Sequence, residues 1–214
     1  MLAVAVEAAS FEGAQDGNGR PRMQTIIGVD PSVAKTGVAV RRPDGEWEFG
    51  FVVPPKGKRD PGRLQWIAAD VAWGMGLAGP ALLVIEKPMQ SRGNPVNLIL
   101  HWRIREELAC HVVGVSTLPV APVHLKQFAT GDARAEKGTI ALAVARKWGD
   151  LLPPDAKEDT IEALVLAKLG ECWLTPDAGH WTEYELDAAL LRKRKQGERT
   201  AEEDSLTFTT QGGE

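Results

Sequence analysis

Thr25-Ile-Ile-Gly-Val-Asp30-Pro-Ser-Val-Ala-Lys-Thr36-Gly-Val-Ala-Val40 is the stretch that decides the fold. Two apolar runs flank a turn rich in Pro, Ser and Gly, and one carboxylate, Asp30, ends the first run. The pattern predicts a buried strand over residues 26–29 and its hairpin partner over residues 38–40. An ionised carboxylate beside a buried strand is costly. Asp30 therefore needs a compensating partner, either as a cap of the turn or as one ligand of a metal site.

Two later stretches repeat the association of an apolar run with acids. Residues 81–85 read Ala-Leu-Leu-Val-Ile and predict a second short strand, which ends in Glu86. Ligands collect beyond the carboxyl ends of parallel strands, so Asp30 and Glu86 are expected to face one point. Residues 157–169 predict a helix on which Asp159 and Glu162, three residues apart, share one face.

The remaining pattern predicts an α/β fold with a mixed five-stranded sheet flanked by helices. Further strands are expected over residues 47–53 and 116–123, the latter at an edge because of Pro119 and Pro122. Further helices are expected over residues 60–75, 96–109, 135–148 and 183–195. We expect a flexible leader over residues 1–22, one domain over 23–175, and a partly helical, partly disordered tail over 176–214. Met23, just before the first strand, is an alternative start of translation.

Composition narrows the class of protein. The 43% hydrophobic content is enough for a sizeable core. The two cysteines, Cys110 and Cys172, are too far apart in sequence to indicate a zinc ribbon, so a reducing cytoplasmic setting is expected, with no membrane span. The net charge of −4 does not exclude a nucleic-acid partner, because residues 176–214 alone carry 9 acidic and 5 basic residues. In the rest of the chain, acidic and basic residues are nearly equal in number.

Four acids form the candidate site: Asp30, Glu86, Asp159 and Glu162. Four carboxylates at one point repel one another, and Mg²⁺ or Mn²⁺ neutralises such a set. Two ions per site would activate a water and stabilise the leaving oxygen of a phosphodiester. Each acid also has a simpler interpretation: Asp30 as a turn cap, Glu86 as a partner of Lys87 or Lys35, and Asp159 as a helix-terminal charge.

The order of these motifs resembles the RuvC-type Holliday-junction resolvases of the RNase H-like nuclease superfamily. The resemblance spans residues 25–173 and is carried by four segments: GVDPS at 28–32 with TG at 36–37, VIEKP at 84–88, VHLKQFATGDARAEKG at 123–138, and EDTIEAL at 158–164. The third segment, followed at the expected distance by the acidic helix, is the most specific. The resemblance implies an RNase H-like sheet and a Mg²⁺-dependent endonuclease acting in DNA recombination and repair.

The resemblance also assigns roles to residues. Asp30, Glu86, Asp159 and Glu162 match its metal-binding acids, while Lys126 and Lys137 match basic residues near the scissile phosphate. Nearby candidates for contact with the DNA are Arg134, Phe128, Gln90 and Arg92; Phe128 either stacks on a base or is buried. The family acts as a homodimer on a four-way junction, and residues 96–109 would supply the dimer surface. Trp102 is either its anchor or a core residue.

One motif departs from the family. The last acid pair is Asp-x-x-Glu, where the family usually ends in Asp, so Glu158 is an alternative to Glu162 as the fourth ligand. The extended acidic tail is typical of bacteriophage members.

Two other classes of protein share part of this pattern. A non-catalytic junction-binding protein on the same fold would not need four acids together. An actin-like kinase also opens with a Gly-x-Asp strand, but it needs a second domain and a nucleotide motif that residues 131–138 do not match.

Overall fold

The computed structural model describes residues 24–74, 76, 80–88, 95–112 and 114–190. Five strands form one sheet in the order β3-β2-β1-β4-β5. The antiparallel part is β1–β2–β3, and β4 and β5 continue the sheet parallel to β1. This is the mixed five-stranded sheet predicted from the sequence. The strands are β1 (Thr25–Asp30), β2 (Thr36–Arg41), β3 (Trp47–Val52), β4 (Ala81–Glu86) and β5 (Val115–Val120).

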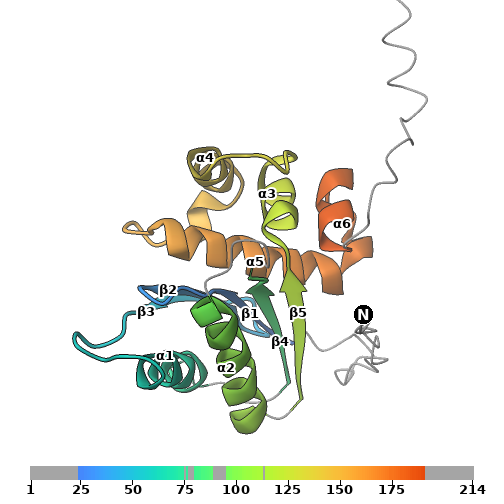
Figure 1. Cartoon of the computed structure of the whole chain (residues 1–214). Coiled ribbons are helices and arrows are strands. Elements are labelled where there is room, and N and C mark those ends of the chain that lie inside the picture. Colours follow the sequence, from blue (N-terminus) through green and yellow to red (C-terminus); the bar gives the residue numbers. More distant parts are fainter. Residues whose placement is uncertain (1–23, 75, 77–79, 89–94, 113, 191–214) are drawn as a thin grey trace, which may run out of the picture.

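Helices cover both faces of the sheet (Figure 1). On one face lie α1 (Gly62–Trp73) and α2 (Pro95–His111), which pack against each other. On the other face α5 (Glu158–Leu174) crosses β1 and β2. Packed around α5 are α3 (Pro122–Thr130), α4 (Lys137–Trp148) and α6 (Glu183–Ala189), with two short 3-10 helices at Gly149–Leu151 and Pro176–Ala178. No helix of the described ranges is long and apolar enough to span a membrane.

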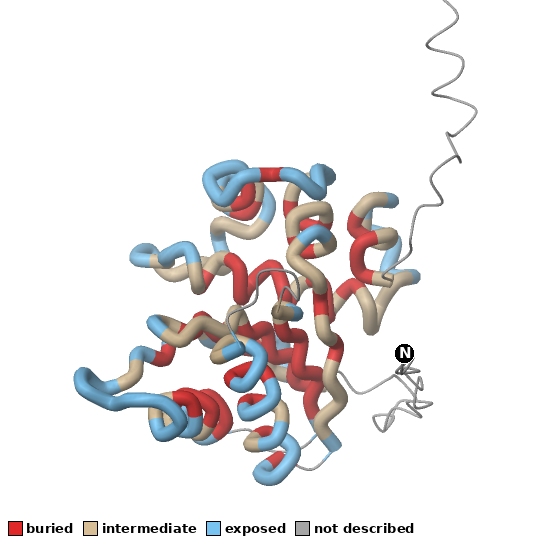
Figure 2. Tube along the Cα trace, in the orientation of Figure 1, coloured by how far each residue is buried: buried red, intermediate tan, exposed pale blue. Residues whose placement is uncertain are grey.

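Alternation along the strands divides the buried side chains into two cores. Ile27 and Val29 of β1 pack with α1 and α2, whereas Ile26 packs with α5. The same alternation in β4 sends Leu83 to the first core and Leu82 to the second. Buried residues therefore line both faces of the sheet and the inner sides of the helices (Figure 2). By the same parity, Asp30 and Glu86 belong to the face that α5 covers.

The structure corrects the sequence prediction around Pro122. The strand expected over residues 116–123 ends at Val120, and Pro122 instead begins the helix α3, which the sequence analysis did not predict. Proline suits the first turn of a helix because that position needs no backbone donor. The expected edge position of β5 is confirmed by the strand order. Of the helix expected over residues 183–195, the described part is α6, and residues 191–195 lie outside the described ranges.

Candidate active site

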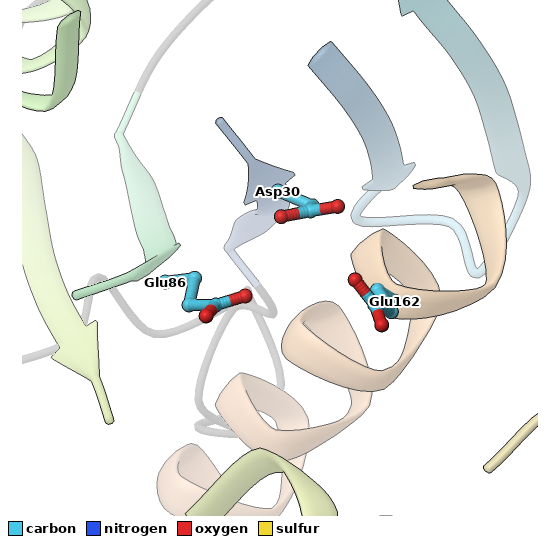
Figure 3. A group of neighbouring side chains, drawn as sticks. All are labelled: Asp30, Glu86 and Glu162. Carbon is cyan, nitrogen blue, oxygen red and sulfur yellow. The ribbon is translucent and has the colours of Figure 1, made fainter. Parts of the chain in front are cut away.

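Three carboxylates converge at one end of the sheet. Asp30 ends β1, Glu86 ends β4, and Glu162 lies in the second turn of α5. One carboxylate oxygen from each lies within 4.8 Å of the others, and Figure 3 shows the three side chains pointing toward one another. All three are partly or fully buried. This is a group of oxygen donors with the spacing needed to hold a metal ion.

Strand pairing brings the two strand acids together. Because β1 and β4 are parallel neighbours, their carboxyl ends lie at the same edge, and the register places Val29 opposite Ile85. Asp30 and Glu86 each follow directly after these paired residues. The two acids therefore leave the sheet side by side, on the face covered by α5.

A glycine lets α5 approach the sheet closely enough to complete the group. A Cβ added at Gly28 would overlap the carbonyl oxygen of Ala163 and lie 2.6 Å from the backbone nitrogen of Ala167. Any side chain at this position would push the helix away from β1. Since Ala163 follows Glu162 directly, the absence of a side chain at Gly28 sets how near Glu162 comes to Asp30.

A second glycine, Gly37, allows the start of α5 to approach β2 closely. A Cβ at Gly37 would overlap the backbone of Asp159. The preceding turn is closed by Thr36, whose hydroxyl donates to the Ser32 carbonyl oxygen (2.9 Å) and accepts from the Ser32 amide (3.2 Å). Thr36 thus supplies the closing hydrogen bonds that the sequence analysis considered as a role for Asp30.

The acids shift one another's proton affinity. Burial, followed by the charges of Glu162 and Glu86, raises the pKa of Asp30 to about 9. Burial and the charge of Glu162 raise the pKa of Glu86 to about 7. Without a cation, the group therefore carries less than its full negative charge at neutral pH, and Asp30 shares a hydrogen bond with Glu162. A divalent cation would reverse this preference and favour the ionised carboxylates.

Basic side chains border the acids. Lys126 of α3 and Lys137, the first residue of α4, line the same cavity of about 310 Å³. The Lys137 ammonium pairs with Glu158 and lies 3.6 Å from Glu162 Oε1. The hydrogen bond to Glu158, together with nearby carboxylate charge, raises the pKa of Lys137. The cavity is lined by Asp30, Ser32, Glu86, Pro122, Leu125, Lys126, Lys137, Ile140, Asp159 and Glu162.

The fourth predicted acid, Asp159, borders the cavity but has a different partner. Its Oδ2 lies 2.6 Å from the Lys35 Nζ. Among the described residues, the acids close enough to share one metal ion are Asp30, Glu86 and Glu162. Lys35, which the sequence analysis considered as a partner of Glu86, pairs with Asp159 instead. Glu158, the alternative fourth ligand, is the partner of Lys137.

The other predicted DNA-contact residues lie in three different settings. Phe128 is fully buried, with its ring centroid 5.9 Å from that of Trp148 and 6.1 Å from that of Trp181. Burial, rather than base stacking, is therefore the correct interpretation of Phe128. Arg134 is exposed beyond α3, where its backbone amide donates to Asp132 Oδ1 (2.8 Å). Gln90 and Arg92 lie outside the described residues.

The sequence analysis did not predict two features of the site: the close approach of α5 to Gly28 and the ion pair between Lys35 and Asp159. Gly28 stands inside an apolar strand, a position where glycine often marks a close backbone neighbour, so its role could have been inferred. The pairing of Lys35 with Asp159 carries no such signal, because the two residues are distant in sequence and other lysines lie near the acids.

Two known proteins that are similar in sequence to this chain carry the same name. No family model matches the chain. It is 34% identical over 126 residues to a crossover junction endodeoxyribonuclease RuvC from Solidesulfovibrio magneticus, covering 56% of this chain and 75% of that protein. It is 26% identical over 149 residues to the RuvC from Synechococcus sp. (strain WH7803), covering 68% and 96%.

A solved structure agrees with the fold. The Thermus thermophilus RuvC structure superposes with a TM-score of 0.51 at 18% identity, covering 67% of this chain and 91% of that one. The likeness extends to the mixed sheet and its flanking helices. On the strength of these relatives, the chain belongs to the RuvC family of crossover junction endodeoxyribonucleases.

Proposed function

We propose that this chain is a divalent-cation-dependent endonuclease that cuts phosphodiester bonds in branched DNA, with the Holliday junction as its main substrate. The observation that carries the proposal is the convergence of Asp30, Glu86 and Glu162 within 4.8 Å. Its relatives are named for cleavage of crossover junctions.

The donor set fits Mg²⁺ or Mn²⁺. All the ligand atoms are carboxylate oxygens, which these hard cations prefer. The raised pKa values of Asp30 and Glu86 support the same assignment, because full ionisation of the group needs a compensating positive charge. We assign the ligands to Asp30, Glu86, Glu162 and Asp159, with two ions per site. Such ions, when bound, supply an activated water and stabilise the leaving oxygen.

Lys126 and Lys137 suit a role in binding the scissile phosphate. Both line the cavity that contains the acids, so a phosphate entering it would meet two ammonium groups. Their positive charge would offset the negative charge that develops on the phosphate as the bond breaks. Lys137 has an exposed side chain and is already paired with Glu158, so it would exchange that carboxylate for the phosphate. Arg134, Gln90 and Arg92 remain predicted contacts farther along the DNA.

A homodimer would place two such sites on one junction. The α2 helix exposes three large apolar side chains in one segment, Leu98, Ile99 and Trp102, at 47%, 47% and 53%. Exposure of Trp102 excludes the core interpretation and supports its role as an anchor for a second copy. A two-fold protein suits the two-fold symmetry of a four-way junction.

Three expectations from the sequence stay predictions. They are the division into residues 1–22, 23–175 and 176–214, a cytoplasmic location, and an origin in bacteriophage.

Cleavage of defined DNA tests the proposal. Purified protein is incubated with Mg²⁺ or Mn²⁺ on a labelled four-way junction, a Y-fork and a linear duplex with the same arm sequences. We expect paired nicks in the junction and little cutting of the duplex. Asp30→Asn should abolish cleavage while leaving junction binding in EDTA intact. Glu162→Gln should cost far more activity than Glu158→Gln, which is the matched control on the same helix.

The alternative is a non-catalytic junction-binding protein. It would be favoured by wild-type protein that binds the junction in EDTA and still leaves it uncut after Mg²⁺ and Mn²⁺ are added. If the junction is neither bound nor cut, the protein is neither a junction endonuclease nor a junction-binding protein.

A further inference from the structure

Lys35 makes a close ion pair at the edge of the candidate active site, and neither the sequence motifs nor the relatives' names assign it a role. It lies in the turn between β1 and β2, and its Nζ is 2.6 Å from Asp159 Oδ2. Both side chains are largely covered, at 22% and 29% exposed. An ion pair with this degree of burial is screened less by salt than one on an open surface.

The position of Lys35 is fixed from more than one side. Its ammonium lies 4.6 Å from the centroid of the Phe51 ring on β3, within the range of a cation–π contact. The backbone of the turn is fixed by the paired hydrogen bonds between Ser32 and Thr36. On the other side, Gly37 allows the first turn of α5 to press against β2, which brings Asp159 to the lysine. The contact is therefore built into the junction of three elements.

The consequence concerns the metal ligands. Asp159 and Glu162 lie in the same helix and line the same cavity, yet Glu162 faces the other acids while Asp159 faces Lys35. The Lys35 ammonium already compensates the charge of Asp159, and it would repel a divalent cation brought to the same carboxylate. A divalent ion and Lys35 therefore compete for Asp159.

We propose that Lys35 is a positioning residue that occupies Asp159 in the metal-free protein and is displaced when a divalent cation binds there, so that it sets the cation concentration at which this ligand is engaged. The inference rests on the proposed function, because it takes the acids to be metal ligands. It predicts two classes of cation site. The ion held by Asp30, Glu86 and Glu162 binds first, and the ion that needs Asp159 binds more weakly.

A simpler role for Lys35 would be to anchor the start of α5. In that case its loss would lower the melting temperature without strengthening cation binding. Only the competing role predicts tighter cation binding when Lys35 is removed, so cation affinity measured directly, without DNA, distinguishes the two roles.

The experiment is a Mn²⁺ titration of the full-length protein at constant pH, with free Mn²⁺ followed by electron paramagnetic resonance. Lys35→Met is compared with wild type and with Lys35→Arg, which keeps the charge. Lys58→Met is the matched control, since Lys58 also lies over an aromatic ring, 5.6 Å from the centroid of Trp66. The same Lys35→Met change is also made in an Asp159→Asn background.

We expect Lys35→Met to tighten the weaker Mn²⁺ site by about three- to tenfold, the range set by the modest strength of a partly exposed ion pair. Lys35→Arg and Lys58→Met should stay within about twofold of wild type, because both leave a positive charge at position 35 opposite Asp159. In the Asp159→Asn background the gain should disappear, as a double-mutant cycle requires of a direct interaction.

Unchanged or weaker Mn²⁺ binding by Lys35→Met overturns the inference, as does an equal gain in the Asp159→Asn background. Thermal melts in EDTA identify a variant that fails to fold, and Lys35→Gln then replaces it. Failure of the proposed function has a separate signature: the wild-type protein itself binds no Mn²⁺ and leaves the junction uncut.

Discussion

Replacing Asp30 by Asn should abolish cleavage and at the same time stabilise the metal-free protein. Asp30 is inserted between Glu86 and Glu162, and burial with their charges raises its pKa to about 9, from an ordinary value of 3.8. An amide has no proton to gain and no charge to bury, and its NH₂ group can still donate to Glu162. The change therefore removes an unfavourable contribution to folding that exists only while no cation is bound.

The sign of the pH dependence follows from proton binding. Between pH 4 and pH 9 the folded protein holds a proton on Asp30 that the unfolded chain has released, so the free energy of unfolding falls as pH rises. For an isolated group the loss by pH 7.5 would approach about 5 kcal/mol, and coupling of its titration to that of Glu86 reduces it to about 2–4 kcal/mol. Asp30→Asn should be more stable than wild type by this amount at pH 7.5 and nearly equal to it at pH 4.

The assay is denaturant unfolding in EDTA at several pH values, compared with the exposed control Asp150→Asn. Adding Mg²⁺ should raise the stability of wild type, by about 2.7 kcal/mol at 100 times the dissociation constant, and leave Asp30→Asn unchanged. If Asp30→Asn is destabilised in EDTA at pH 7.5, or if its advantage is the same at pH 4, the reasoning about the buried carboxylates is refuted.

Four further predictions test separate parts of the structure. Gly28→Ala should cost about 1–3 kcal/mol in denaturant unfolding, because its Cβ overlaps α5, and cleavage should fall by about 100-fold as α5 shifts. Phe128→Ala should cost about 3–5 kcal/mol, as expected for a fully buried ring, and a smaller loss would argue for a surface role. Trp102→Glu should dissociate the proposed dimer in analytical ultracentrifugation and leave the melting temperature of the monomer nearly unchanged, because this side chain is 53% exposed. Lys126→Met should slow cleavage by about 100-fold with less than a threefold change in junction binding in Ca²⁺, and equal losses in both would assign Lys126 to binding alone.

The sequence predicted the sheet and the position of the site because both depend on local patterns. Apolar runs ending in Asp30 and Glu86 indicated two strands, and parallel pairing of β1 with β4 was enough to bring their ends together. Glu162 could be placed on a helix from its spacing alone. Spacing alone could not show that Glu162, rather than Glu158, faces Asp30. Both residues lie near the start of α5, and the packing of the helix decides which one points to the other acids.

What the sequence could not predict depends on contacts between distant segments. The helix α3 was missed because Pro119 and Pro122 together indicated an edge strand, whereas only Pro119 lies in β5 and Pro122 occupies the first turn of a helix. The burial of Phe128 depends on Trp148 and Trp181, which come from later parts of the chain. The pairing of Lys35 with Asp159 likewise exists only once β2 and α5 are packed together.

The burial of α5 has a consequence for how this protein could acquire new substrates. The helix that carries Asp159 and Glu162 also supplies the middle of one core, with a run of fully buried residues from Ala163 to Ala167. A mutation that moved the acids would therefore disturb the whole molecule, and selection would remove it. Arg134 lies on the exposed rim between α3 and α4, where a side chain can change without altering that core or the lysines beside the acids. Divergence in DNA preference should accumulate along this rim while the acidic centre stays fixed.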